Sequence, residues 1–285
     1  MSETPALARD EAASLRRVRS PRLSLTRFRG RLTYASKVSI ATCVTVVLLW
    51  WLVAWLEVVP AMFLPSPVAV ASKFFSVWTD GFQDATLLQH LIASVDRVSA
   101  ALVGAMVFGV ILGFTMHLSE TGRGVIEPLL EFYRPIPPLA YLPLVIIWFG
   151  IGEFAKILVI FLGILPSIMI ATVDGLKSVP RDMINAARSL GATRSQVILL
   201  VLLPHAFPSI LTGTRIGLGT GWATLVAAEL VAASRGLGFM IKGAADFLVT
   251  DVVILGIFVI AAAAIAMEIA LRLLQRAVAP WQGRQ

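Results

Sequence analysis

Long runs without a charged residue alternate with short polar segments along most of this chain. Residues 38–56, 98–119 and 157–173 contain no Asp, Glu, Lys or Arg. A helix needs about 20 mainly apolar residues to cross a bilayer, and its backbone must satisfy its own hydrogen bonds there. The pattern predicts an all-α integral membrane protein with about six transmembrane helices. The predicted spans are 38–56, 98–119 (in a helix that begins near His90), 127–153, 157–173, 209–233 and 252–270.

Four prolines interrupt the third predicted span, at positions 135, 137, 138 and 143. Proline removes a backbone donor, so in lipid the freed carbonyl must be satisfied by a neighbouring helix or a water-filled cavity. Two interpretations stay open: a kinked helix that only packs, or a bent helix that lines a pathway, as broken helices do in transporters. The second makes Arg134 and Tyr141 part of a polar wall.

The longest polar interruption after the N-terminal segment covers residues 178–204. Pro180 suits a first helical turn, and Gly191 suits the left-handed residue that ends a helix. Thr193 and Gln196 have the spacing of a capping box that begins a second helix. We predict two short helices that meet at a corner, the first thin and basic enough to be held in a groove of another protein. The cations on the first helix and its flanks are Lys177, Arg181, Arg188 and Arg194.

Pro204 and Pro208 follow this second helix. We predict that the helix lies at the membrane interface and ends at Pro204, and that the fifth span begins near Ser209. Residues 195–214 also lack Asp, Glu, Lys and Arg, so a separate span there is an alternative, although the two prolines would divide it.

The fifth predicted span combines small residues with two ionisable ones. Its glycines favour close helix packing over a phosphate loop, because no strand precedes them. Arg215 and Glu229 should be paired, near an interface or facing water, since a charge at the centre of a span costs about 3 kcal/mol or more. Asp96 and Arg97, at the head of the second span, are interpreted as a solvated helix end. The glycines are Gly213, Gly217, Gly219 and Gly221.

Composition and charge agree with a membrane protein. The chain has 285 residues, 58% of them hydrophobic and 14% charged, with a mean hydropathy of +0.85 and a formal charge of +7. Soluble proteins contain about 25% charged residues. The cations gather in the first 37 residues and in loops, as the positive-inside rule requires, and not in a patch for nucleic acid. The run 38–56 is also too long for the core of a signal peptide. We therefore expect a cytoplasmic, disordered tail at 1–37, a transmembrane domain at 38–276 and a cytoplasmic tail at 277–285.

Motifs for catalysis or metal binding are missing from the sequence. It contains no G-x-x-x-x-G-K-[ST], H-E-x-x-H or G-x-S-x-G, so we expect no enzyme activity and no ATP bound by this chain. His90, His117 and His205 are far apart, and Cys43 is the single cysteine, so no metal site is expected. The chain is interpreted as a conduit, for which an ion-driven secondary transporter or channel is one candidate class.

A resemblance to a known family indicates a different and more specific class of transporter. Asn185-Ala186-Ala187-x-x-x-Gly191, followed after nine residues by Val201-x-Leu203-Pro204, resembles the EAA loop of ABC importer permeases. Asn185 replaces the glutamate of that motif, so any salt bridge of that glutamate is not expected here. Four further segments are similar to the nitrate/sulfonate/taurine branch, and most similar to taurine permeases. They are F-L-P-S-P (63–67), F-Y-R-P-I-P-P-L-A-Y-L-P-L (132–144), I-W-F-G-I-G-E (147–153) and G-W-A-T-L-V-A-A-E-L-V-A-A-S-R-G-L-G-F-M (221–240).

The resemblance implies a type I ABC importer permease in the bacterial inner membrane. It implies a homodimer, two cytoplasmic ATPase subunits that hold ATP and Mg, and a periplasmic or lipid-anchored binding protein. The cargo would be a small sulfonate, taurine first, with another alkanesulfonate, nitrate or a pyrimidine precursor as alternatives. The coupling loop would be 174–204, and a zwitterion such as taurine needs a cation or donor and an aromatic face along its route. The coupling residues would be Asn185, Ala186, Ala187, Arg188, Gly191, Leu203 and Pro204, and the pathway residues Arg134, Tyr141, Trp222 and Thr224.

Overall fold

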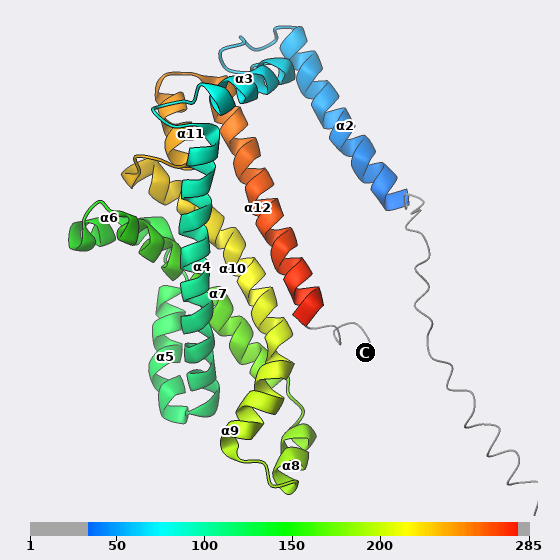
Figure 1. The fold of residues 1–285 in the computed structure, drawn as a ribbon, viewed down its shortest axis with the longest axis vertical. Helices are drawn as coiled ribbons and strands as arrows, with labels where there is room; N and C mark the ends of the chain where they lie inside the picture. Colours follow the sequence, from blue (N-terminus) through cyan, green and yellow to red (C-terminus); the bar gives the residue numbers. More distant parts are fainter. Residues whose placement is uncertain (1–33, 279–285) are drawn as a thin grey trace, which may run out of the picture. The chain divides into compact units, whose positions relative to one another are not determined.

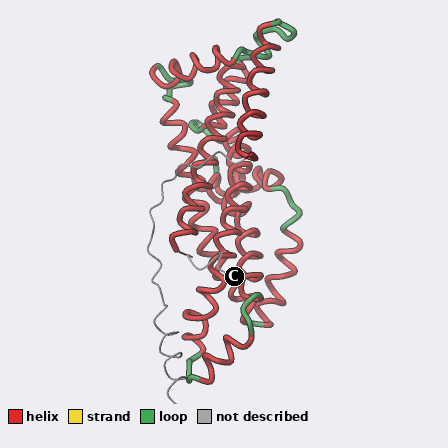
Figure 2. Tube along the Cα trace, turned by 90° about the vertical axis from the view of Figure 1, so that its right-hand side faces the viewer, coloured by secondary structure: helices red, strands yellow, loops and turns green. Residues whose placement is uncertain are grey.

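A computed structural model describes residues 34–278, and Figures 1 and 2 show that helices account for nearly all of its regular secondary structure. The predicted tails at 1–37 and 277–285 lie outside the described residues, except for 34–37 and 277–278, which belong to helices. The helices are α2 (Tyr34–Trp55), α3 (Pro67–Thr79), α4 (Leu87–Leu118), α5 (Glu120–Tyr133), α6 (Pro138–Phe149), α7 (Glu153–Lys177), α8 (Arg181–Ser189), α9 (Arg194–Val197), a π-helical turn (Ile198–Leu202), α10 (Leu203–Ala232), α11 (Leu237–Asp246) and α12 (Thr250–Val278).

Among the described residues, 34–49 belong to one unit and 50–278 form a second. The part of α2 in the first unit exposes apolar side chains such as Val46 and Leu48. This is the surface that a lipid-facing helix presents. Within residues 34–278, five helices are long and apolar enough to cross a membrane, and six spans result if α5 and α6 count as one broken span. The predicted number of spans is therefore confirmed by length and composition.

The third span is broken and not merely kinked. α5 and α6 meet at 105°, and the break covers residues 134–137. Pro135 and Pro137 lie in the break, and Pro138 begins α6, where its missing N–H leaves no bond unmade. α5 also starts at Glu120, seven residues before the predicted 127, because Ser119 ends α4 and caps α5 at once.

The predicted stop at Pro204 is wrong. α9, the π-helical turn and α10 form one candidate span, from Arg194 to Val231, so neither an interfacial helix ending at Pro204 nor a separate span at 195–214 is observed. The π-turn hydrogen bond from the Leu203 N–H to the Ile198 carbonyl lies directly before Pro204. Pro204 therefore stands in the first turn of α10, where proline is tolerated.

α7 packs against both α4 and α10 and forms the centre of the second unit (Figure 1). Ile160, Ile164 and Ile168 of α7 are fully buried between these neighbours. A Cβ atom at Gly217 or Gly221 of α10 would lie 2.8 Å from Ile164 atoms, and one at Gly213 would collide with Ala171. The packing interpretation is thus confirmed for these three glycines, which repeat every four residues. Gly219 has no neighbour within 4 Å and takes no part.

Candidate functional site

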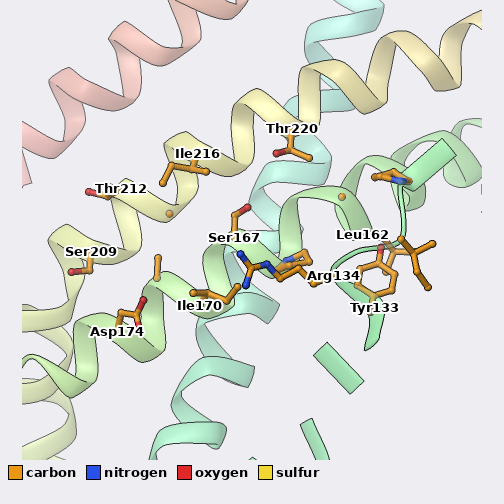
Figure 3. Close-up of a pocket in the computed structure, with 16 residues that line it drawn as sticks. Tyr133, Arg134, Leu162, Ser167, Ile170, Asp174, Ser209, Thr212, Ile216 and Thr220 are labelled. Carbon is orange, nitrogen blue, oxygen red and sulfur yellow. The ribbon is translucent and has the colours of Figure 1, made fainter. Parts of the chain in front are cut away.

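A cleft of about 570 Å³ opens where the break between α5 and α6 faces α7 and α10 (Figure 3). One wall of the cleft consists of Arg134 and Ile136 from the break, together with the adjoining ends of α5 and α6. Residues of α7 and α10 form the facing walls. The lining residues are Tyr133, Arg134, Ile136, Pro138, Leu162, Gly163, Pro166, Ser167, Ile170, Ala171, Asp174, Ser209, Thr212, Gly213, Ile216 and Thr220. The prolines that break the span therefore also create one wall of the cleft.

Arg134 is the predicted pathway residue that lines the cleft. It directly follows α5 as the C-cap of that helix, and Figure 3 shows its side chain directed toward Ser167 and Ile170 of α7. Within residues 34–278, no hydrogen bond or ion pair engages its guanidinium group. A guanidinium group has five donors and can bind an oxyanion through two parallel hydrogen bonds.

The other three predicted pathway residues lie behind the cleft wall. The Tyr141 hydroxyl is hydrogen-bonded to the hydroxyl of Tyr133, which lines the cleft, at 2.5 Å. Thr224 is buried, donates to the Thr220 carbonyl at 2.8 Å, and packs beside Gly163. Trp222 is buried in the core between α4 and α7, and its indole N–H has no partner among the described residues.

The sequence interpretation missed the hydroxyl and carboxyl groups of the cleft. α7 contributes Ser167 and Asp174, and α10 contributes Ser209, Thr212 and Thr220. On each helix these residues recur at helical spacing on one face, together with small residues. A search for polar side chains at that spacing within the apolar runs would have found them.

The predicted corner is present at α8 and α9. Gly191 has φ +85°, and the Ala192 N–H donates to the Ala187 carbonyl at 3.0 Å, which is the closing bond of a Schellman motif. Thr193 and Gln196 form the predicted capping box. Pro180 precedes the first helical residue, one position earlier than predicted.

The surface of the corner is open. Asn185, Ala186, Arg188, Gly191 and Pro204 are exposed, whereas Ala187 and Leu203 are half-buried. Two apolar side chains are exposed as well, Met183 at 47% and Leu190 at 89%. Met183, Ala187 and Leu190 share one helical face, so α8 presents an apolar strip between exposed cations.

A buried charge cluster joins four helices at the end of the bundle away from this corner. Glu229 of α10 is 1% exposed and Arg97 of α4 is 5% exposed, and their side chains pair at 2.6 Å. The Glu229 carboxylate also accepts from the Ser94 hydroxyl and from the Gly238 N–H, both at 2.8 Å. Arg97 forms a second, bidentate pair with Glu153, which also binds Lys156 at 2.6 Å.

This cluster corrects one prediction and confirms another. Arg97 is not a solvated helix end, although the adjacent Asp96 is exposed. Arg215 and Glu229 are both paired, as expected for ionisable groups in a span, and Arg215 contacts Glu268 of α12 at 2.9 Å. The partners of Arg97 lie 56 and 132 residues away in sequence, so no local pattern could identify them.

A family model described as "Binding-protein-dependent transport system inner membrane component" matches residues 105–283. The chain belongs to this family. It is 52% identical to the taurine transport system permease protein TauC of Escherichia coli K12, over 90% of this chain and 94% of that protein. It is 36% identical to the putative aliphatic sulfonates transport permease protein SsuC of the same organism, over 84% of this chain and 89% of that one.

The fold agrees with this membership. A chain of the inward-facing MetNI methionine ABC transporter superposes with a TM-score of 0.57, at 21% identity, covering 67% of this chain and 95% of that chain. The predicted fold, that of a type I ABC importer permease, is therefore confirmed. This permease is a transport subunit and not an enzyme, and the candidate class of ion-driven transporters is excluded by the family to which it belongs.

Proposed function

We propose that this permease carries taurine across the bacterial inner membrane as part of an ATP-driven importer. The observation that carries the proposal is the 52% identity to a taurine permease over nearly the whole of both chains. Another alkanesulfonate is the second candidate, because an aliphatic sulfonate permease is 36% identical.

The proposed assembly is a homodimer with two ATPase subunits on its cytoplasmic side and a substrate-binding protein on the other. ATP and Mg belong to the ATPase subunits. The corner at α8 and α9 is the proposed contact with an ATPase, and its exposed Leu190 and Met183, flanked by cations, support this role. ATP-driven closure of the ATPases would then move the helices attached to the corner and alternate access to the cleft.

The proposed orientation places both termini and the corner in the cytoplasm. The cations of the corner and the excess of cations in residues 1–37 support it by the positive-inside rule. In this orientation the buried charge cluster lies toward the periplasm and the cleft opens nearer the cytoplasm.

The cleft is the proposed section of the substrate route. Arg134 would contact the sulfonate directly, while Tyr141 and Thr224 would support the wall through Tyr133 and Gly163. Trp222 would contact the substrate only if its indole N–H, which has no partner among the described residues, becomes accessible as the helices move.

The proposed function is tested by taurine uptake in a strain that lacks the gene, with taurine as sole sulfur source. We expect uptake to be lost, to return with the gene, and to require the co-purifying ATPase. Wild-type uptake in the deletion strain would contradict the proposed substrate, and failure of the purified permease to bind any ATPase would contradict the proposed assembly.

Replacing Arg134 with alanine is expected to lower taurine uptake about tenfold or more, because one charge-assisted contact with the sulfonate is lost. The measurement is ATP-dependent uptake in proteoliposomes with the complete importer, alongside ATPase activity. Arg123→Ala is the control, since Arg123 pairs with Glu127 at 2.9 Å on an exposed face and lines neither cavity at this break. Unchanged uptake in Arg134→Ala would remove this residue from the route.

A further inference from the structure

Two charged residues of opposite sign line the cleft, and neither has a partner among residues 34–278. Arg134 comes from the break after α5, and Asp174 comes from the last turn of α7 (Figure 3). No other charged residue is among those that line the cleft in the described chain. In residues 34–278 no hydrogen bond or ion pair engages either side chain. The charged groups of the buried cluster, in contrast, are all paired.

A second cavity, of about 160 Å³, shares part of its lining with the first. Arg134 and Asp174 line both cavities. The other charged groups of the second cavity are Glu127, Glu131 and Lys177. Glu127 is already paired with Arg123, and Glu131 lines only the smaller space. Asp174 is therefore the carboxylate common to both cavities.

Residues with hydroxyl side chains line the cleft between the two charged residues. Ser167 lies beside Arg134, and Ser209 and Thr212 of α10 lie across from Asp174 (Figure 3). Hydroxyls can donate to an oxyanion and accept from an ammonium group. The Arg134 end of the cleft thus suits an oxyanion, and the Asp174 end suits an ammonium group.

We propose that Arg134 and Asp174 form a dipolar site that selects zwitterions with an oxyanion at one end and an ammonium group at the other. The inference rests on the proposed function, which it deepens. Both side chains are exposed and line the same cleft, so each is accessible to a ligand there. A zwitterion satisfies both charges at once, whereas a simple anion would pair with Arg134 and leave Asp174 unpaired beside it, with repulsion between like charges.

The site should therefore discriminate between taurine and ethanesulfonate, which has the same sulfonate and carbon chain but no ammonium group. Selection at this site would add to selection by the binding protein. It would act on the substrate after its release into the permease.

The test is equilibrium dialysis of radiolabelled taurine and ethanesulfonate against the permease–ATPase complex in nanodiscs, without a binding protein. We expect the wild type to bind taurine about tenfold more tightly than ethanesulfonate, and Asp174→Asn to lose this preference while binding ethanesulfonate at least as well. Glu131→Gln is the matched control, because it removes one negative charge from the smaller cavity only, and it should keep the preference. Arg134→Ala should weaken both ligands.

Equal binding of the two ligands by the wild type, or an unchanged preference in Asp174→Asn, would overturn the inference even where ATP-dependent taurine uptake is intact. A preference for the zwitterion that disappears in Asp174→Asn, in a transporter that shows no taurine uptake, would support the inference and overturn the proposed substrate. Binding therefore tests the dipolar site, and uptake tests the proposed substrate.

Discussion

Glu229→Ala is expected to lower the free energy of unfolding by about 3–5 kcal/mol, since removing one partner of a buried ion pair leaves the other uncompensated. The Glu229 carboxylate binds Arg97, Ser94 and the Gly238 N–H, and all of these would lose a partner. Because Gly238 lies in the first turn of α11, the variant should also weaken the contact between this helix and α10. Thermal unfolding of the purified permease in detergent measures the effect.

The double variant Arg97→Met with Glu229→Met tests whether the uncompensated charge of Arg97 causes the loss of stability. Replacing both buried ions with apolar side chains of similar size is often neutral, so the double variant should be more stable than Glu229→Ala. Glu153 would keep Lys156 as its partner, at 2.6 Å. Glu268→Ala is the control for a less buried pair and should lower the free energy of unfolding much less than Glu229→Ala, since the Glu268 side chain is 43% exposed. Equal stability of Glu229→Ala and the wild type would show that the cluster does not hold the bundle together.

Gly191→Val is expected to leave the permease in the membrane but to uncouple ATP hydrolysis from taurine uptake. Gly191 has φ +85°, a conformation that costs a β-branched residue about 1–3 kcal/mol. The strain comes from the backbone alone, because a Cβ atom at this position would meet nothing within 4 Å. The chain can relieve it by changing the angle between α8 and α9, which would displace the proposed ATPase contact.

The measurement is the ratio of taurine uptake to ATP hydrolysis in proteoliposomes, which should fall about tenfold or more, since loss of about 1.4 kcal/mol at the contact corresponds to a factor of ten. Gly191→Asn is one control, because asparagine tolerates left-handed backbone, and it should retain most coupling. Gly124→Val is the other, because a Cβ atom at Gly124 also meets nothing and its φ is not positive. Coupling that survives in Gly191→Val would exclude the corner as the element that transmits force.

The spans and the corner were predictable because both depend on local rules. An apolar run of sufficient length predicts a span wherever it occurs, and the capping box at Thr193 and the left-handed Gly191 are each specified by a few adjacent residues. The stop at Pro204 failed for the same reason. A single proline was judged by its usual effect, whereas the π-helical turn before it lets the helix continue.

The candidate site was only partly predictable. Arg134 could be selected from the prolines around it, because broken spans line pathways and a cation there has a function. Asp174 lies at the end of an apolar helix, and its only mark in the sequence is the helical spacing from Ser167. Its place in the same cleft as Arg134 depends on how α5, α7 and α10 pack.

The sequence by itself determined the membrane class, the number of spans and the local geometry of the corner, because each of these depends on hydrophobic length and on backbone preferences of neighbouring residues. Only the tertiary structure decided which charges are satisfied. Arg97 and Glu229 neutralise each other across 132 residues of sequence, whereas Arg134 and Asp174, in the described part of the chain, line the cleft without a charged partner. The physical reason is that the free energy of a charge in a membrane protein depends on the groups within a few ångströms, and these come from helices far apart in the chain.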